Sequence, residues 1–470
     1  QIWMLPMIIC RFGGQKVKRR EFLTATGGVA LGLGCKTSGS LPAQSIDEEG
    51  CHWSGHARQV EQLGGMPLEN LLDLYRADLF EDFLPFMERH IIDHKHGGFI
   101  CRTDRDGTHI NEKKYIWYEG RGIWVYSFLY RHLTQNPKHL EVARRSVDFI
   151  MRHEPDDEHL WPLRYSRKGE VLLEAKVPED RIYGDLFVAE GLAEYAAASG
   201  EKVYFEKAKG IIRKCMRIYD RSDYYPTAGR DYLGDDYPLL PGPRILGHWM
   251  VFLRAATQML RTDPSDLELQ SVAVRSLDAI MNDHFNPRFD LINEILNHDL
   301  SRNEAFEQFV YPGHAAETLW MVMDEARRVS DQGLFRKAAE RFFPHLEVSW
   351  DDVYGGFFPG LNHVDNNDWN MIKPLWTQEE AMVGAMMLIE MTGSLRAKEW
   401  FNRTNAYVRE NMVLKRHGFP LWDLLTDRQS TFKRDAKRVG NYHHPRHLML
   451  NILSLQRLIE NGGRPRGWMS

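Results

Sequence analysis

Histidines close to helix starts are the clearest chemical signal in this sequence. Within YPGHAAETLW, His314 follows a Pro-Gly pair and Glu317 lies three residues later, on the same helix face. The Glu317 carboxylate could hold the His314 imidazole in one tautomer and raise its basicity. Within YHHPR, His443 and Arg446 are also three residues apart, and Arg446 could stabilise a substrate oxygen or tune His443. An ordinary surface pair and a histidine cluster capping the last helix are the structural alternatives. The arrangement predicts proton transfer, because the imidazole pKa lies near neutral pH.

Two further segments combine aromatic and charged side chains. In WYEGRGIW, which begins at Trp117, glycines flank Arg121 and would let it reach a cavity. In KPLWTQEEA, the ring of Trp376 lies four residues from the Glu380 carboxylate, on one side of a helix. His248 adds a third histidine at a helix start. These residue types suit the binding of a polar substrate with several oxygens.

No metal and no cofactor are predicted. His443 and His444 adjoin a proline but have no acid or cysteine at ligand spacing. The five cysteines match neither a metal site nor a dense disulfide framework, and no phosphate-binding loop is present. The net charge of −5 is spread without a basic patch, so nucleic acid is not an expected partner.

The apolar pattern is helical almost everywhere from Glu69 onward. Chemically unusual residues recur every 63 to 66 residues, each near the start of an even-numbered helix: Arg121, Asp185, His248, His314, Glu380 and His443. Twelve helices are predicted to begin near Glu69, Tyr118, Lys138, Ile182, Lys202, Arg244, Asp266, Gly313, Gln332, Trp376, Ser394 and Tyr442.

Six helix pairs of this length predict an all-α fold closed into a ring, with the even-numbered helices inside. Their N-terminal ends, which carry partial positive charge, would then meet at one mouth. Gly- and Asp-rich segments between the pairs, at 93–99 and 352–357, predict short β-hairpins on one face. An open solenoid would show the same repeat but would not need polar residues at the inner helix starts.

Four motifs together resemble the N-acylglucosamine 2-epimerase family, which includes cellobiose 2-epimerases and mannose isomerases. They are WxxGRxxW at 117–124, GHxxETxW at 313–320, KxxWxxxEA at 373–381 and YHxPR at 442–446. The resemblance covers roughly Glu69 to Glu460 and implies an (α/α)6 barrel.

The resemblance also implies roles for individual residues. His314 and His443 match the catalytic histidine pair, and His248 more loosely matches the histidine linked to ring opening. Arg121 matches the arginine that binds a substrate oxygen, with Glu317 and Glu380 as site carboxylates. The remaining expected substrate contacts are Trp376, Arg446, Trp117 and Asp185. Leu375 and Glu119 depart from the family pattern at the expected sugar-binding wall, which leaves the substrate in doubt.

The expected function is therefore a sugar 2-epimerase or aldose–ketose isomerase. After ring opening, one histidine would remove the proton at carbon 2, and Arg121 would stabilise the cis-enediolate. Returning the proton to the opposite face gives the epimer, and returning it to the neighbouring carbon gives a ketose. A disaccharide such as cellobiose or mannobiose is the first expectation and mannose the second. A glycoside hydrolase or lyase using Asp185, Glu317 and Glu380, and a non-catalytic carbohydrate-binding protein, are the alternatives.

The first residues resemble an export signal. Arg19-Arg20 and Phe22-Leu23 precede a short, weakly apolar stretch, as in twin-arginine signals. Cys35 is a candidate lipid-attachment residue. Residues 1–43 are thus expected to be signal and linker, and residues 44–470 one catalytic domain. The expected location is the periplasm, free or anchored to a membrane that faces it, as a monomer or homodimer.

Overall fold

The computed structural model describes residues 59–104, 106–177, 182–224, 233–414, 419–420, 423–425 and 441–468. Contacts divide the chain after His52, and every described residue belongs to the second unit, Trp53–Ser470. The predicted leader, including Cys35, lies outside the described residues. Among the helices that are described, none has the length and apolar character needed to cross a membrane.

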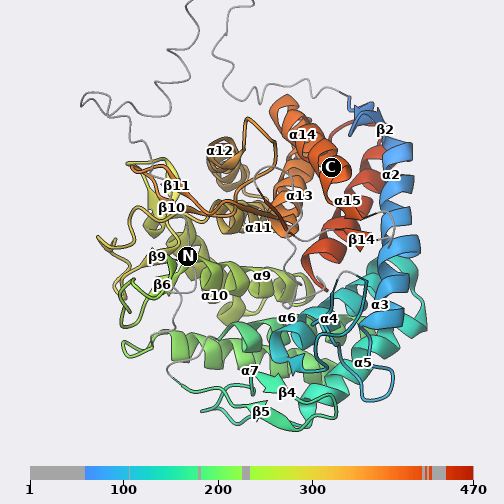
Figure 1. Cartoon of the computed structure of the whole chain (residues 1–470), viewed down its shortest axis with the longest axis vertical. Helices are drawn as coiled ribbons and strands as arrows, with labels where there is room; N and C mark the ends of the chain where they lie inside the picture. The colour runs from blue at the N-terminus through green and yellow to red at the C-terminus, as the bar shows by residue number, and fades with distance from the viewer. Residues whose placement is uncertain are drawn as a thin grey trace, which may run out of the picture. The chain divides into compact units, whose positions relative to one another are not determined.

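Paired helices make up most of the described unit and form an (α/α)6 barrel (Figure 1). Each inner helix packs against the next, and α15 contacts α4 to close the ring. The inner helices are α4 (Ile116–Leu129), α6 (Tyr183–Ser199), α9 (Leu246–Thr262), α11 (Pro312–Arg328), α13 (Leu375–Thr392) and α15 (His443–Glu460).

Outer helices cover the ring. They are α2 (Leu68–Ala77), continued by η1 (Asp78–Phe83) and α3 (Leu84–His90), then α5 (Pro137–Met151), α7 (Lys202–Tyr219), α10 (Leu267–Asp278), α12 (Gln332–Ser349) and α14 (Leu395–Asn411). The segments η2 (Tyr130–Thr134) and η3 (Ala279–Asp283) extend α4 and α10. All twelve predicted helix starts fall within two residues of an observed start, and the predicted ring is confirmed.

The difference between inner and outer helices follows from their side chains. Inner helices such as α4 and α13 are buried on nearly every side, whereas α7 buries one apolar stripe and exposes lysines and arginines. Small residues let α4 and α6 approach closely: a Cβ at Gly191 would collide with the Gly120 carbonyl oxygen. The outer helices α10, α12 and α14 are capped by side chains, since Asp266, Asp331 and Ser394 accept backbone N–H groups at their N-termini.

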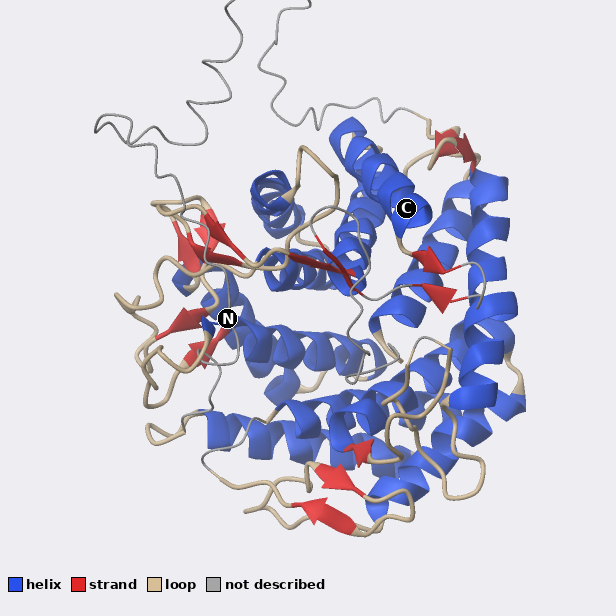
Figure 2. Cartoon of the chain, viewed as in Figure 1, coloured by secondary structure: helices blue, strands red, loops and turns tan. Residues whose placement is uncertain are grey.

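The strands are short and confined to the connections between helices (Figure 2). β3 (Lys114–Tyr115), β6 (Arg244–Ile245) and β12 (Ile372–Pro374) each run directly into the start of an inner helix, so these connections help to position the N-terminal ends of α4, α9 and α13. The strand pairs are β1 (Gln62–Leu63) with β2 (Met66–Pro67), β4 (Arg164–Tyr165) with both β3 (Lys114–Tyr115) and β5 (Val171–Leu173), β6 (Arg244–Ile245) with β9 (Ile295–Leu296), β7 (Phe285–Asn286) with β8 (Leu291–Ile292), β10 (Leu361–His363) with β11 (Asp368–Trp369), β12 (Ile372–Pro374) with β15 (Asp423–Leu425), and β13 (Val413–Leu414) with β14 (Phe419–Pro420).

The two predicted Gly-rich hairpins are tight turns closed by single bridges, Ile92 to Phe99 and Trp350 to Phe357. Both turns are held in the same way. Each buries an aspartate that pairs with a buried lysine, at 3.0 Å for Asp93–Lys114 and 2.6 Å for Asp351–Lys373.

The side chain that closes each turn differs between the two copies. Glu119 accepts the Phe99 N–H at 3.0 Å, and Gln378 accepts the Phe357 N–H at 2.8 Å. The two turns are therefore structural copies in which a carboxylate and an amide take the same place.

Candidate active site

The N-terminal ends of α11, α13 and α15 bring three predicted residues together. The ring of Trp376 lies 5.7 Å from the His314 ring and 5.5 Å from the His443 ring, measured between centroids. Gly313 makes this approach feasible, because a Cβ there would come within 2.5 Å of the indole. Both imidazoles keep 17% of their surface exposed, so a substrate could reach them.

His314 is oriented by Glu294, in the connection before β9. Its Nδ1 atom lies 3.0 Å from Glu294 Oε1, and Glu294 is fully buried. A carboxylate only accepts hydrogen bonds, which places the proton on Nδ1 and makes Nε2 the nitrogen that exchanges protons with a substrate. Burial acts to lower the pKa of His314, but the Glu294 carboxylate outweighs it and raises the pKa above the ordinary value.

The predicted His314–Glu317 pair is wrong. Glu317 instead accepts a hydrogen bond from the Arg446 guanidinium, because a buried arginine is a stronger partner for a carboxylate than a neighbouring imidazole.

His443 is held by a second and different arrangement. Its Nδ1 atom lies 2.8 Å from Glu380 Oε1, and the same oxygen accepts a hydrogen bond from Arg446 at 2.7 Å. Trp320 donates its indole N–H to the other Glu380 oxygen at 2.8 Å. Burial lowers the pKa of His443 well below its ordinary value, and Arg446 and Arg121 act in the same direction against Glu317.

Arg446, Glu317 and Glu380 were expected to contact substrate, but the structure places them behind His443. Arg446 and Glu380 are 0% exposed and Glu317 is 2% exposed. The hydrogen bonds and ion pairs described for these side chains are with one another and with His443 and Trp320. These three side chains therefore position the His443 imidazole and influence its protonation state.

Arg121 is half-buried among aromatic rings. Its guanidinium carbon lies 4.0 Å from the centroid of Phe187, 4.8 Å from that of Tyr442 and 5.3 Å from that of Trp117. Within the described part of the chain its Nε atom has no hydrogen-bond partner. Tyr442 directly precedes His443, and their ring centroids lie 5.5 Å apart. The Arg121 guanidinium therefore contacts the side chain next to His443. It can donate a hydrogen bond to a substrate oxygen there.

The remaining predicted contacts take different positions. Trp117 is 38% exposed beside Arg121, where it can meet a ligand. His248 is fully buried, with its ring centroid 4.3 Å from that of Tyr183 and 5.3 Å from that of Tyr219. The structure does not place Asp185 with the histidines. Its carboxylate lies 3.0 Å from the Lys214 ammonium and accepts the Trp161 N–H at 3.1 Å.

Two residues expected at the sugar-binding wall lie elsewhere. Glu119 is fully buried on the Phe99 turn, where Ser146 also donates to it at 2.7 Å. Leu375 is buried and faces a separate cavity beside Glu379.

Glu294 and Tyr311 are site residues that the sequence did not reveal. The ring of Tyr311 stands at 85° to that of His314, with a centroid distance of 4.6 Å. Tyr311 directly precedes the Pro-Gly pair and could have been noticed from its place in that motif. Glu294 lies in the connection between β8 and β9, 20 residues before His314 and on no helix with it.

The profile of the N-acylglucosamine 2-epimerase (GlcNAc 2-epimerase) family matches residues 97–444. The chain belongs to this family. N-acylglucosamine 2-epimerase from Mus musculus is 24% identical over 331 residues, which cover 65% of this chain and 72% of that protein.

Solved structures share the fold of this family member. Cellobiose 2-epimerase from Spirochaeta thermophila DSM 6192 superposes with a TM-score of 0.70 at 18% identity, covering 83% of this chain and 98% of that one. A D-mannose isomerase superposes with a TM-score of 0.63 at 14% identity, covering 84% and 97%.

Proposed function

We propose that this chain is a sugar 2-epimerase or aldose–ketose isomerase that acts on a reducing mono- or disaccharide. One observation carries the proposal: two accessible histidines from different inner helices flank one indole ring, and their pKa values are shifted in opposite directions. Separated pKa values in neighbouring groups mark an acid and a base. The family relatives are sugar 2-epimerases and a mannose isomerase, which agrees with this chemistry.

In the proposed reaction the sugar first opens to its aldehyde form. His443, neutral at physiological pH, takes the proton from carbon 2 through Nε2. The electron pair moves into a carbon–carbon double bond and the former carbonyl oxygen becomes negative. Arg121 donates hydrogen bonds to the resulting cis-enediolate, where fixed positive charge lowers the barrier most.

Protonated His314 then returns a proton. Delivery to the opposite face of carbon 2 gives the epimer. Delivery to carbon 1 gives the ketose, once the proton on the carbon 2 oxygen has moved to the carbon 1 oxygen. In the reverse reaction His314 acts as the base and His443 as the acid, because the two histidines together carry one proton. The indole of Trp376 provides an apolar face on which the sugar can rest between the two imidazoles.

Glycoside hydrolysis is less well supported by the geometry. It needs two carboxyl groups that reach the scissile bond from either side. The three candidates Asp185, Glu317 and Glu380 are at most 2% exposed, and each is engaged by lysine, arginine or tryptophan. A non-catalytic carbohydrate-binding role leaves the opposite pKa shifts of the histidines unexplained.

We further propose that the protein acts outside the cytoplasm, in the periplasm or anchored at Cys35 to a membrane facing it. Only the leader-like sequence before residue 44 supports this location. An exported enzyme would meet free oligosaccharides, which favours disaccharides such as cellobiose or mannobiose over mannose.

The function can be tested with a panel of reducing sugars and product analysis by NMR. Cellobiose, mannobiose, mannose and N-acetylglucosamine are incubated with the chain from residue 44 onward. A new 2-epimer or ketose from one of them is the expected result. Release of shorter sugars would instead indicate hydrolysis, and binding without any product would indicate the non-catalytic alternative.

A further inference from the structure

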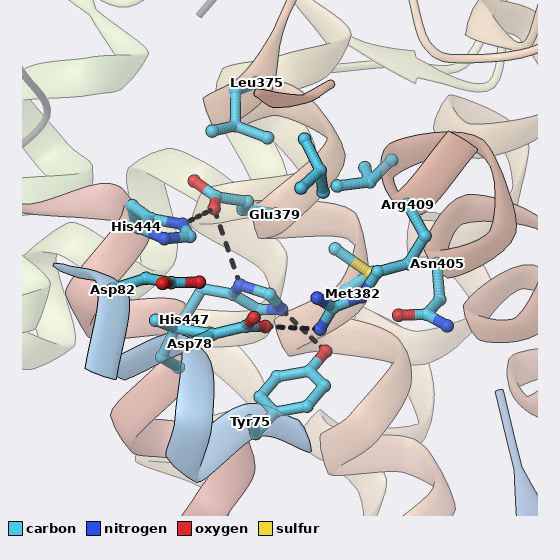
Figure 3. Close-up of a pocket in the computed structure, with 13 residues that line it drawn as sticks. Tyr75, Asp78, Asp82, Leu375, Glu379, Met382, Asn405, Arg409, His444 and His447 are labelled. Carbon is cyan, nitrogen blue, oxygen red and sulfur yellow. Dashed lines mark hydrogen bonds and ion pairs between the residues drawn. The ribbon is translucent and has the colours of Figure 1, made fainter. Parts of the chain in front are cut away.

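A second histidine–carboxylate cluster lies on two of the same helices, next to Glu380 and His443 in the chain (Figure 3). Glu379 on α13 faces His444 and His447 on α15. Its Oε1 atom lies 2.5 Å from His444 Nδ1 and 3.5 Å from His447 Nδ1. All three side chains are buried, and each offers one ligand atom within 4.8 Å of the others. Glutamate and histidine are ligands that zinc and related metals prefer.

Two buried atoms of this cluster lack hydrogen bonds. Among the described residues, neither Glu379 Oε2 nor His447 Nδ1 has a hydrogen-bond partner. Glu379 is 0% exposed and His447 is 5% exposed. A buried carboxylate oxygen without a partner is costly, and a native structure normally satisfies it. A cation beside these atoms would satisfy both.

The cluster borders a cavity of about 40 Å³, which is enough for an ion with one or two water molecules. Asp78 and Asp82 of η1 also line this cavity, together with one arginine, Arg409. Arg409 is paired with Asp78 (Figure 3). The carboxylates of Glu379 and Asp82 thus give the cavity a surplus of negative charge when the histidines are neutral.

The outer contacts of His447 also fit a metal ligand. Its Nε2 atom lies 3.0 Å from the Tyr75 hydroxyl. Histidines that bind a metal through one ring nitrogen usually donate the other N–H to a neighbouring oxygen, which fixes the tautomer. In the tautomer that directs Nε2–H at Tyr75, the lone pair of Nδ1 points towards Glu379.

We propose that Glu379, His444 and His447 bind one divalent transition-metal ion, with zinc as the best fit and Asp82 or water completing the coordination. Ligands of a tetrahedral zinc stand about 3.3 Å apart. The Glu379–His447 separation already matches, and the Glu379–His444 hydrogen bond opens by about 0.8 Å on binding. The ion joins α13 and α15 beside η1, so its role is structural. The sequence concealed this site, since Glu379 lies 65 residues before His444 and no motif links them.

The test is zinc binding to the chelator-treated protein, by competition with a chromophoric chelator and by thermal unfolding. We expect one tightly bound zinc per chain and a higher Tm with zinc. Glu379→Gln and His447→Gln should each weaken binding by at least about 100-fold, because a lost ligand costs more than a lost outer contact. His159→Gln, at an exposed histidine paired with Asp156, is the matched control and should bind as tightly as the unaltered chain.

Two measurements keep the test decisive. Cobalt(II) added to the unaltered chain should give the intense visible absorption of a tetrahedral site, so the result does not depend on a variant that folds. His443→Asn tests the other carboxylate–histidine group, formed with Glu317 and Glu380. Zinc binding that is lost in His443→Asn but kept in His447→Gln would overturn the proposal. So would the absence of stoichiometric binding.

Discussion

At the residue scale, the two histidines differ because their carboxylates differ. Among the described residues, Glu294 has one oxygen on His314 Nδ1 and none on a cation, so its full charge acts on that imidazole. Glu380 shares its oxygen between His443 and the Arg446 guanidinium, which compensates the charge. The same imidazole–carboxylate contact therefore raises the pKa in one case and leaves burial to lower it in the other.

Glu294→Gln should move the alkaline limb of the pH–rate profile to lower pH. The active pair carries one proton, which rests on His314, and activity falls as that proton is lost. Removing the Glu294 charge lowers the pKa of His314, so the loss begins at lower pH. Profiles of kcat/KM for the variant and for Glu304→Gln, at an exposed site nearby, provide the check. An unchanged alkaline limb would contradict the assignment of His314 as the acid.

Arg121→Gln should lower kcat by about 10²- to 10³-fold, the size of effect seen when a donor to a developing oxyanion is removed. KM should change much less, because the charge appears only in the transition state. Lysine is expected to restore little, since an ammonium cannot stack as a plane among Phe187, Tyr442 and Trp117. Steady-state kinetics of Arg121→Gln and of the exposed control Arg152→Gln measure kcat and KM. A change in KM alone would assign Arg121 to ground-state binding.

At the element scale, Arg446 connects three inner helices. It lies on α15 and binds Glu317 of α11 and Glu380 of α13, all without exposure to solvent. The end of the barrel that carries the histidines is thus held by one cation between two anions. Losing the cation would leave two buried carboxylates without compensation.

Arg446→Met should reduce the free energy of unfolding by about 3–5 kcal/mol, as when one partner of a buried ion pair is removed. It should also raise the pKa of His443, moving the acidic limb of the pH–rate profile to higher pH. Urea unfolding and the pH profile measure the two effects, with Arg464→Met as an exposed control on the segment after α15. Lower stability with an unmoved acidic limb would restrict Arg446 to a structural role.

The paired turns allow a second test at this scale. Burial raises the pKa of Glu119 to about 7, so folding favours its protonated form. The associated stability is present below the unfolded pKa near 4.5 and is lost as pH rises through 7, up to about 3 kcal/mol. Glu119→Gln should fold well, because Gln378 fills the same place in the other turn. It should also remove this pH dependence.

Unfolding free energies of Glu119→Gln between pH 4.5 and 8, compared with the unaltered chain and with the exposed Glu206→Gln, measure the effect. A variant whose stability falls with pH as steeply as that of the unaltered chain would show that Glu119 is not the group responsible.

At the scale of the whole molecule, the repeat in the sequence predicted the barrel because each helix pair has nearly the same length. The same repeat did not predict the direction of each side chain. Arg121, His314 and His443 reach the site, but Asp185 turns to Lys214 and His248 is buried among tyrosines. An inner helix has one side towards the mouth of the barrel and other sides towards its neighbouring helices. A position near a helix start therefore does not predict which side a residue occupies.

Contacts between distant segments were the main part of the site that the sequence left hidden. Glu294 reaches His314 from the connection before β9, and Glu317 pairs with Arg446 from the far end of the chain. Helical spacing suggested the local pair His314–Glu317 because it only compares residues on one helix. Tertiary contacts decided the partners, since a buried guanidinium competes more strongly for a carboxylate than an imidazole does.

The central claim is that His443 and His314 serve opposite faces of carbon 2, and single-histidine variants in heavy water test it most directly. Once a substrate is known, each of its two epimers is incubated separately with His314→Asn and His443→Asn, and NMR follows carbon 2. We predict that each variant loses interconversion by about 10²- to 10⁴-fold. Each should still exchange deuterium into one epimer with retention, and the two variants should act on different epimers. Interconversion at an undiminished rate in either variant would contradict the account.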